Sequence, residues 1–302
     1  MKSIFIQIAA YHDYELPRTI NDCIKKSSGG YRLNFGINLV YYNDEIAIPN
    51  LSNIKFEKTK APINLGVGLG RYIANSFYKD EDYYLQIDAH TRFVENWDKL
   101  IIDCFEKHQL DGYKPIITAY PANYEYIDHE LKLDENLSIC DIDFKRDENA
   151  KKQFKNKFFI DQHGIANKED NIFSKSVSGG SVFSSGDIAL IKPNKKMFNW
   201  GEEMLSAARY FTHGYDILLP EKQYLYHLYY DNSDPIKNMR RLAGQDFPDE
   251  VGKIIKSSDN EIYRIFSNKV IGDQELGSKR TLRGYGKYTG LDFYSQNIDR
   301  MV

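Results

Sequence analysis

The sequence predicts an α/β fold, an open mixed sheet flanked by helices. Apolar runs of strand length alternate with stretches of helical spacing between residues 3 and 120, in the order β-α-β-β-α-β-α-β. The first run, residues 4–8, is apolar at every position but Gln7, as in strands that a parallel sheet buries on both faces. These two observations together predict an open α/β sheet rather than a helical bundle or a β-sandwich.

The composition is that of a globular protein. A length of 302 residues is enough for a full core, and 42% hydrophobic with 27% charged residues is ordinary. The net charge of −3 gives no case for nucleic acid or an anionic membrane as a partner. No apolar run approaches the roughly 20 residues of a membrane span, and residues 1–3 lead into a strand without a signal-peptide layout. We therefore expect a cytoplasmic protein with no membrane span.

The cysteines indicate neither a zinc site nor disulfides. Cys23, Cys104 and Cys140 are widely spaced and form no CxxC pair. Cys23 and Cys104 lie on stretches of helical spacing, where we expect them to fill space in the core.

The first 120 residues carry the clearest elements. Strands are expected at residues 3–10, 33–42, 54–56, 83–87 and 114–120, and helices at 18–26, 66–77 and 97–108. Pro17 suits a first helical position, and Trp97, Leu100 and Ile101 follow the spacing of an amphipathic helix.

The remaining chain is less regular. Residues 123–171 are rich in charged side chains and read as a hairpin or an insertion that faces a cleft or the solvent. Later elements are expected at 177–185, 201–212, 215–219 and 224–230, with helical pieces at 251–255 and 262–265 before an irregular end. In the strand at 177–185, Gly179 and Gly180 allow another group to approach the backbone closely. We expect one large domain over residues 1–233 and a helical or irregular extension over 234–302 that packs on it.

A carboxylate and an imidazole follow the strand at 83–87. Side chains at i and i+2 leave the same face of extended backbone, so Asp88 and His90 converge beyond the strand's C-terminal end, where open α/β sheets bind ligands. One oxygen and one nitrogen ligand suit Mn²⁺ or a similar divalent ion. Without further context, an Asp-x-His pair at this position is more often only a solvated loop.

Three other features are ambiguous by themselves. Residues 66–71 do not fit GxGxxG, yet a glycine-rich helix start can bind phosphate with help from Arg71, or be only a flexible turn. Glu202 and Glu203 begin a helix, where acidic residues commonly just complement the helix dipole. His227 lies among apolar and aromatic neighbours, where a histidine is more often a core residue than a ligand.

The combination of motifs resembles a known family. The matching stretches are AYHDYELP at 10–17, GR at 70–71, DYYLQIDAHTRF at 82–93, WD at 97–98, GEE at 201–203, THGYD at 212–216, HLY at 227–229, LGSKRTL at 276–282 and GLDF at 290–293. They resemble glycosyltransferases of the GT-A fold, and more narrowly the hydroxyproline N-acetylglucosaminyltransferases, retaining enzymes that modify a Skp-type ubiquitin-ligase adaptor. Residues 83–93 are the most specific part of the resemblance.

The chain departs from that family at two motifs. The family usually has Ser-Tyr-Arg-Asp where residues 10–13 read Ala-Tyr-His-Asp, and Asp-Ser-His where residues 88–90 read Asp-Ala-His. The metal-ligand residue types are kept in both. The acidic middle segment and the tail match least, and we expect the acceptor to be selected there.

The resemblance implies a transfer of GlcNAc from UDP-GlcNAc, with retention, to a hydroxyl of a protein or glycan acceptor. It implies Mn²⁺ or Mg²⁺ held by Asp88, His90 and His227. It also implies a set of donor-binding residues: Ala10, Tyr11, Asp13, Arg71, Gln86, Asp88 and Ala89. Asp88, Glu202 and Glu203 are the implied catalytic residues, with the glutamates either orienting substrate or acting as a base.

Three other functions remain open. Asp-x-His also occurs in GT-A transferases that use UDP-Gal or UDP-GalNAc. A non-catalytic nucleotide-sugar-binding module would keep the same residues and bind without turnover. A metal-dependent phosphoesterase would need more clustered carboxylates than the sequence offers.

Overall fold

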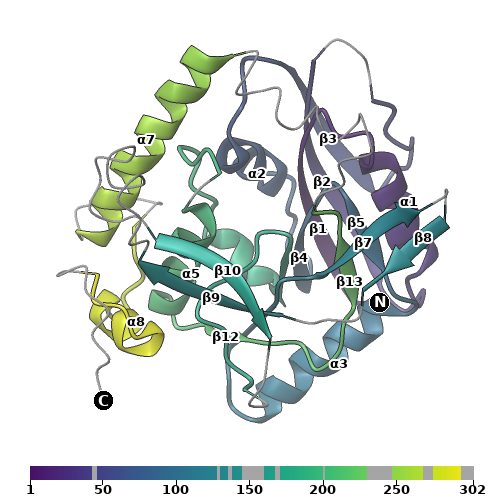
Figure 1. Ribbon diagram of the computed structural model, residues 1–302. Helices are drawn as coiled ribbons and strands as arrows, with labels where there is room; N and C mark the ends of the chain where they lie inside the picture. The colour runs from purple at the N-terminus through teal and green to yellow at the C-terminus, as the bar shows by residue number, and fades with distance from the viewer. Residues whose placement is uncertain are drawn as a thin grey trace.

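A seven-stranded mixed sheet forms the centre of the protein (Figure 1). The computed structural model describes residues 1–42, 46–127, 130–134, 138–144, 160–166, 171–199, 201–229, 247–267 and 275–293. The strand order is β12-β6-β11-β4-β1-β2-β3. These strands are β1 (Ser3–Tyr11), β2 (Arg32–Tyr41), β3 (Ile54–Lys60), β4 (Tyr83–Asp88), β6 (Pro115–Thr118), β11 (Ser181–Ser185) and β12 (Asp216–Leu218).

All strands of this sheet run parallel except β11, which is antiparallel to both β4 and β6. The apolar first run forms β1 at the middle of the sheet, and Ile4, Ile6 and Ile8 are fully buried there. Their neighbour Phe5 is buried on the opposite face, as the two-residue period of a strand requires. The expectation of an open mixed α/β sheet is therefore confirmed.

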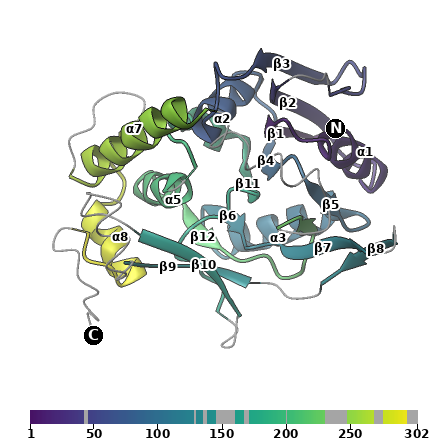
Figure 2. The same cartoon turned by 45° about the horizontal axis from the view of Figure 1, so that its top comes forward.

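Helices cover both faces of the sheet (Figure 2). On one face lie α1 (Leu16–Lys25) and α3 (Trp97–Leu110), whose apolar sides share a core with Ile4 and Ile6. On the other face lie α2 (Val67–Asn75) and α5 (Glu202–Thr212), with α7 (Pro248–Phe266) and α8 (Leu282–Thr289) packed outside them. No helix in the described residues is both long enough and apolar enough to cross a membrane.

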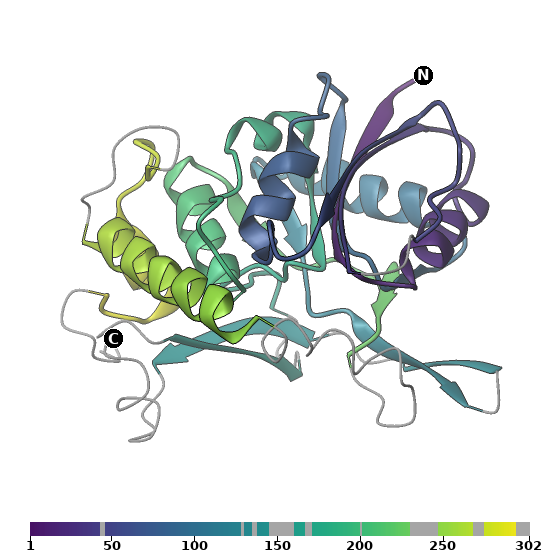
Figure 3. The ribbon, with the colours of Figure 1, turned by 90° about the horizontal axis from the view of Figure 1, so that it is seen from above.

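Two smaller sheets lie on the side of the molecule away from the N-terminus (Figure 3). One pairs β9 (Ser138–Phe144) with β10 (Ile160–Ala166) in antiparallel register. The other has the order β5-β13-β7-β8 and is built from β5 (Thr91–Phe93), β13 (Leu225–His227), β7 (Ala122–Ile127) and β8 (Glu130–Leu133). The charged segment 123–171 thus supplies most of both smaller sheets, and parts of it lie outside the described residues.

The tail is more regular than the sequence predicts. The two helical pieces expected at 251–255 and 262–265 belong to the single helix α7, and α8 forms where irregular chain was expected. Ser258 explains why the pattern looked interrupted. This serine is buried, and its hydroxyl accepts a hydrogen bond from Phe198 N (2.7 Å) and donates to Lys196 O (2.9 Å). A polar residue therefore occupies the buried face of α7 because it holds the loop before α5.

Candidate functional site

Asp88 lies at the C-terminal end of β4, a central strand of the seven-stranded sheet. The sequence predicts this carboxylate at the end of a strand. Asp88 is opposite Ala9 of β1 in the sheet register, and its backbone oxygen accepts a hydrogen bond from the Thr91 hydroxyl (2.8 Å). This turn directs the Asp88 side chain to the edge where the parallel strands end. The carboxylate is partly exposed there.

His90 follows in the turn between β4 and β5, and a carboxylate fixes its ring. His90 Nδ1 lies 2.9 Å from Asp13 Oδ2, so Nδ1 carries the proton and Nε2 presents its lone pair. Asp13 is itself held at the start of α1, where its Oδ1 accepts a hydrogen bond from Glu15 N (3.0 Å). Asp13 is also part of the described lining of the cavity beside the cluster, so a contact with the donor stays a prediction.

His227 approaches Asp88 and His90 from the four-stranded sheet. It ends β13, which pairs with β5 so that His227 lies opposite Thr91. Its Nε2 is 3.0 Å from Asp88 Oδ2 and 2.8 Å from His90 Nε2. Three side chains that are far apart in sequence therefore converge, and this cluster has the composition expected of a metal site.

The spacing within the cluster fits a single divalent ion. The three ligand atoms are separated by 2.8, 3.0 and 3.9 Å. Two ligand atoms that bind one ion at about 2.1 Å lie about 3.0 to 3.4 Å apart, depending on the coordination geometry. One carboxylate and two imidazoles suit Mn²⁺ or a similar ion and leave positions for substrate oxygens. The residue types present therefore suit the divalent ion that the resemblance implies.

Asp88 is held in its charged form. Burial opposes ionisation, but the hydrogen bond from His227 and the positive charges around the carboxylate overcome it and keep the pKa of Asp88 well below its usual value. Arg71 Nη2 contributes at 3.4 Å from Asp88 Oδ1. A permanently ionised carboxylate is the form that binds a metal.

Arg71 is buried beside the cluster and forms an ion pair with Glu202. Its guanidinium lies against Gly179, where a Cβ atom would clash with it. A Cβ on Gly180 would come within 3.0 Å of Asp88 Oδ2. The expectation that the two glycines allow close approach is confirmed, and the approaching groups are Arg71 and Asp88.

Glu203 follows Glu202 in α5 and contacts the backbone of Gly179. Its carboxylate accepts hydrogen bonds from Gly179 N and from Gln162 Nε2 (2.8 Å). Burial and the neighbouring negative charge of Glu202 raise its pKa to about 7, against the Gly179 hydrogen bond, which favours the charged form.

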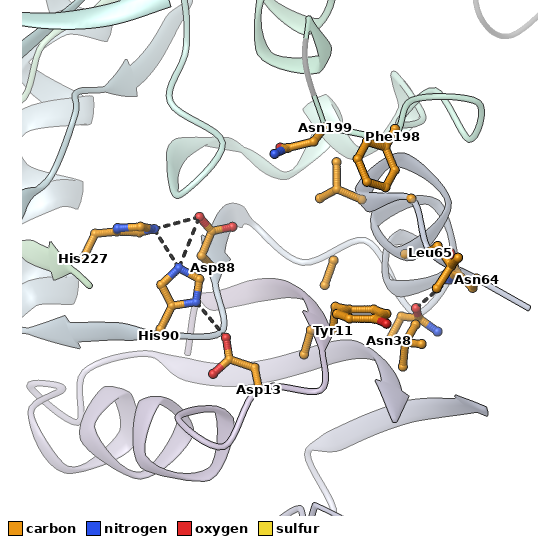
Figure 4. A pocket seen from close by; sticks show the side chains of 16 residues that line it. Tyr11, Asp13, Asn38, Asn64, Leu65, Asp88, His90, Phe198, Asn199 and His227 are labelled. Carbon is orange, nitrogen blue, oxygen red and sulfur yellow. Dashed lines mark hydrogen bonds and ion pairs between the residues drawn. The ribbon is translucent and has the colours of Figure 1, made fainter. Parts of the chain in front are cut away.

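A cavity of about 340 Å³ extends from the metal cluster (Figure 4). Its described lining is Ala9, Ala10, Tyr11, Asp13, Asn38, Val40, Asn64, Leu65, Gly66, Val67, Gly70, Asp88, His90, Phe198, Asn199 and His227. Figure 4 shows Asp88, His90 and His227 at one end, and Asn38 and Asn64 at the other, beyond Tyr11. We call it the donor cavity.

Five of the expected site residues, namely Arg71, Gln86, Ala89, Glu202 and Glu203, are outside the described lining of the donor cavity. Gln86 Nε2 donates to Gly179 O (2.9 Å), and Ala89 O accepts from the Thr19 hydroxyl (2.7 Å). These groups hold the strands around the cluster in position. Ala10, Tyr11, Asp13 and the three metal-site residues do line the cavity.

The start of α2 is not an open anion site. Val67 N donates to Phe198 O (2.7 Å) and Gly68 N to Met197 O (3.0 Å), so a loop already occupies the first amide groups of this helix. These two amide groups are therefore not available to a phosphate, and phosphate binding by the rest of residues 66–71 stays a prediction. The glycines allow the close packing of that loop, because a Cβ on Gly68 would clash with Asn194 O.

Several lining residues were missed by the sequence reasoning. Asn38 lies on β2 and Asn64 precedes α2, and Asn64 Nδ2 donates to Asn38 Oδ1 (2.9 Å). Asn64 Oδ1 is buried without a hydrogen-bond partner among the described residues. Phe198 and Asn199 come from the loop that Ser258 holds. Only Asn38, a polar residue in an apolar strand, gave a signal in the sequence.

His12 occupies the position where the resembled family has arginine. Its ring nitrogens lie 3.0 Å from Tyr42 N and 3.2 Å from the Tyr14 hydroxyl. His12 therefore ties the end of β2 to the turn after β1, and it is not part of the described lining of the donor cavity.

Comparisons with known proteins agree with this geometry. A model of the glycosyltransferase (GlcNAc) family matches residues 44–243. Among solved structures, GalNAc-T7 with UDP, GalNAc and Mn²⁺ is similar with a TM-score of 0.53 and 13% identity, over 97% of this chain and 56% of that one. S. aureus TarS aligns with a TM-score of 0.43 and 11% identity, over 89% of this chain and 43% of that one. A sequence comparison with curated proteins finds no match.

The chain thus spans about half the length of the GalNAc-T7 structure, and the likeness concerns the fold, which is of the GT-A type. The family match is broader evidence because it covers about two thirds of the chain, including Asp88, His90 and His227. This chain belongs to the glycosyltransferase (GlcNAc) family.

Proposed function

We propose that this protein is a metal-dependent glycosyltransferase that moves GlcNAc from UDP-GlcNAc, with retention, to a hydroxyl group of a protein or glycan. The observation that carries the proposal is the convergence of Asp88, His90 and His227 at one end of the donor cavity. The family match supports the sugar, and the motifs shared with the hydroxyproline N-acetylglucosaminyltransferases support the narrower relationship.

Asp88, His90 and His227 would hold Mn²⁺ or Mg²⁺. The ion, when bound, neutralises charge on the diphosphate of the donor and acts as a Lewis acid as UDP departs. Asp13 keeps the His90 ring in the tautomer that presents Nε2. Arg71 keeps Asp88 ionised and satisfies the charge of Glu202, so its role is to support the ligands from behind.

The donor would extend along the cavity away from the cluster. Tyr11 would offer an aromatic face to the uridine. The small side chain of Ala10 would let the uridine come close to the protein backbone. The amide groups of Asn38 and Asn64 lie at the far end, where a uracil base needs both a donor and an acceptor. The distribution of polar groups thus supports a diphosphate at one end and a base at the other.

The transfer exchanges one glycosidic bond for another. The acceptor oxygen bonds to the anomeric carbon, and the bond from that carbon to the β-phosphate oxygen breaks with its electron pair on UDP. The hydroxyl proton passes to a phosphate oxygen of the departing UDP. Glu202 is committed to Arg71 and Glu203 to Gly179 and Gln162, which supports a positioning role for both.

Calorimetric titration of UDP in the presence of Mn²⁺ tests the proposal. The native chain should bind, and Asp88→Ala should lose at least tenfold in affinity because one of three protein ligands is gone. Asp103→Ala, which removes an exposed carboxylate on α3, is the matched control. Equal affinity of the native and Asp88→Ala chains would contradict the metal site.

Hydrolysis of a panel of UDP-sugars with Mn²⁺ tests the donor. We expect UDP-GlcNAc to be turned over fastest. Faster turnover of UDP-GalNAc or UDP-Gal would replace the sugar assignment and leave the metal site intact. Binding of UDP-sugars without release of UDP over hours would indicate a non-catalytic binding module.

A further inference from the structure

A second cavity, of about 400 Å³, is lined by residues of both smaller sheets. It contains the rings of Tyr120 and Tyr229 and the polar side chains of Asn123, Asp134, Gln162 and His163. On the basis of the proposed function, we propose that this cavity binds the acceptor and that the acceptor is a carbohydrate. We call it the acceptor cavity.

The acceptor cavity is in contact with the reaction centre. The ring of Tyr229 lies against that of His227, with centroids 4.4 Å apart. Gln162 Nε2 donates to Glu203 Oε2 at 2.8 Å, and Glu203 in turn accepts from Gly179, next to the glycine that contacts Asp88. A ligand in the acceptor cavity therefore lies one side chain, Tyr229, away from His227. On the other side, Gln162 and Glu203 connect the cavity to the two glycines beside Arg71 and Asp88.

Its aromatic wall is fixed in place. The Tyr229 hydroxyl donates to Pro121 O (2.8 Å), and Tyr229 N donates to Asn123 Oδ1 (3.3 Å). The Tyr120 ring lies 6.4 Å from that of Tyr229 at an angle of 39°. Tyr229 keeps 42% of its surface exposed, so part of a pre-positioned ring is open to a ligand.

The polar groups of the cavity are suited to hydroxyl groups rather than to anions. No lysine or arginine is among its described lining residues, and Asp134 contributes a negative charge. A phosphorylated or otherwise anionic acceptor would find no counterion in this lining. Amide, imidazole and carboxylate side chains beside two tyrosine rings provide hydrogen bonds for sugar hydroxyls and a flat surface for the sugar ring.

The backbone around the cavity favours a sugar over a peptide. A peptide that binds as an added strand needs free backbone donors and acceptors. Tyr120 N already donates to Ser138 O (2.9 Å), Asp134 N to Asn123 O (3.0 Å) and Tyr229 N to the Asn123 side chain. Recognition by side chains is what this lining offers.

Transfer assays with two acceptor panels test the inference. The full chain is incubated with UDP-GlcNAc and Mn²⁺, and either with methyl glycosides of common mono- and disaccharides or with peptides that carry serine, threonine or hydroxyproline. We expect saturable transfer to at least one glycoside. Transfer to peptides alone would overturn the inference, as would release of UDP with no transfer to any glycoside.

Variants of the cavity then assign the binding site. Tyr120→Ala should raise the KM for the glycoside about tenfold or more, with a smaller change in kcat, and Tyr120→Phe should restore it because the ring remains. Asp134→Asn and His163→Ala, both at exposed side chains, should also raise this KM. Asp103→Asn on α3 is the control. Unchanged KM values in all three cavity variants would overturn the inference.

UDP affinity separates this inference from the proposed function. Calorimetry with UDP and Mn²⁺ reports the donor cavity alone, and the cavity variants should keep the native affinity there. If the native chain does not bind UDP, the proposed function fails. If it binds and turns over UDP-GlcNAc while the acceptor variants behave as the native chain does, only the acceptor assignment fails.

Discussion

Arg71 and Glu202, 131 residues apart in sequence, form an ion pair in which each side chain is only 5% exposed. Arg71 also reaches Asp88, so one guanidinium compensates two carboxylates at the base of the site. Taking such charges out of water is costly, and the pairing compensates that cost only while all partners are present. The pair therefore links the stability of the fold to the electrostatics of the metal cluster.

Arg71→Met should destabilise the protein by about 3 to 5 kcal/mol, because it leaves the buried carboxylate of Glu202 without its positively charged partner. The double variant Arg71→Met, Glu202→Gln should recover much of that loss. Urea unfolding of both variants measures the free energies. A double variant no more stable than Arg71→Met would show that the ion pair is not the cause.

Asp13→Asn should weaken Mn²⁺ binding about 10- to 100-fold, because a carboxylate that orients a histidine ligand contributes on this scale. Asparagine keeps the Oδ1 atom that accepts from Glu15 N, so α1 should begin normally. Mn²⁺ titration checks the affinity and thermal unfolding checks the fold. Native Mn²⁺ affinity in Asp13→Asn would show that the Asp13–His90 contact does not affect the ligand.

Glu203 should make the fold less stable as pH rises from 4.5 to 7. Its pKa is about 7 in the folded chain against 4.5 for an ordinary glutamate, so the folded state holds the proton more tightly across this window. The contribution is lost as pH rises and amounts to at most about 3 kcal/mol. Unfolding of the native chain and of Glu203→Gln across the window measures it. Parallel stability profiles would mean that Glu203 titrates normally.

Gly68→Ala should lower the free energy of unfolding by about 1 to 3 kcal/mol, because its Cβ would clash with Asn194 O. Since the same loop carries Phe198 and Asn199 to the donor cavity, UDP affinity should fall as well. The matched control is Gly252→Ala on α7, which has open space around it and should stabilise the helix by about 0.5 to 1 kcal/mol. Unfolding experiments and UDP titration of both variants measure the two effects. Native stability and native UDP affinity in Gly68→Ala would contradict the close packing of this loop on α2.

Local patterns predicted the main sheet and two of the three residues of the metal cluster. The apolar run of β1 and the i, i+2 spacing of Asp88 and His90 depend only on residues that are neighbours in the chain, so both can be recognised in the sequence. The convergence of His227 with them depends on β13 pairing with β5 across more than 130 residues. Only the resemblance to a family, and no spacing in the chain, indicated that histidine.

The tertiary partners of the site could not be predicted in the same way. The contact of Asp13 with His90 and the ion pair of Arg71 with Glu202 had no signal in the sequence. A charged residue's partner is chosen by the packing of distant elements, and residue type does not reveal it. Ser258 illustrates the same limit. A serine on the buried face of α7 interrupts the apolar pattern of the helix, and its hydrogen bond with Phe198 is a tertiary contact that the sequence does not reveal.

The distribution of the metal cluster over two sheets has a mechanical consequence. Asp88 ends β4 of the seven-stranded sheet and His227 ends β13 of the four-stranded sheet, and a shared ion would cross-link these two sheets. Hydrogen exchange at β13 should then slow when Mn²⁺ is added and quicken with a chelator. The cation would thereby act as a clasp that sets how readily the four-stranded sheet parts from the rest of the protein.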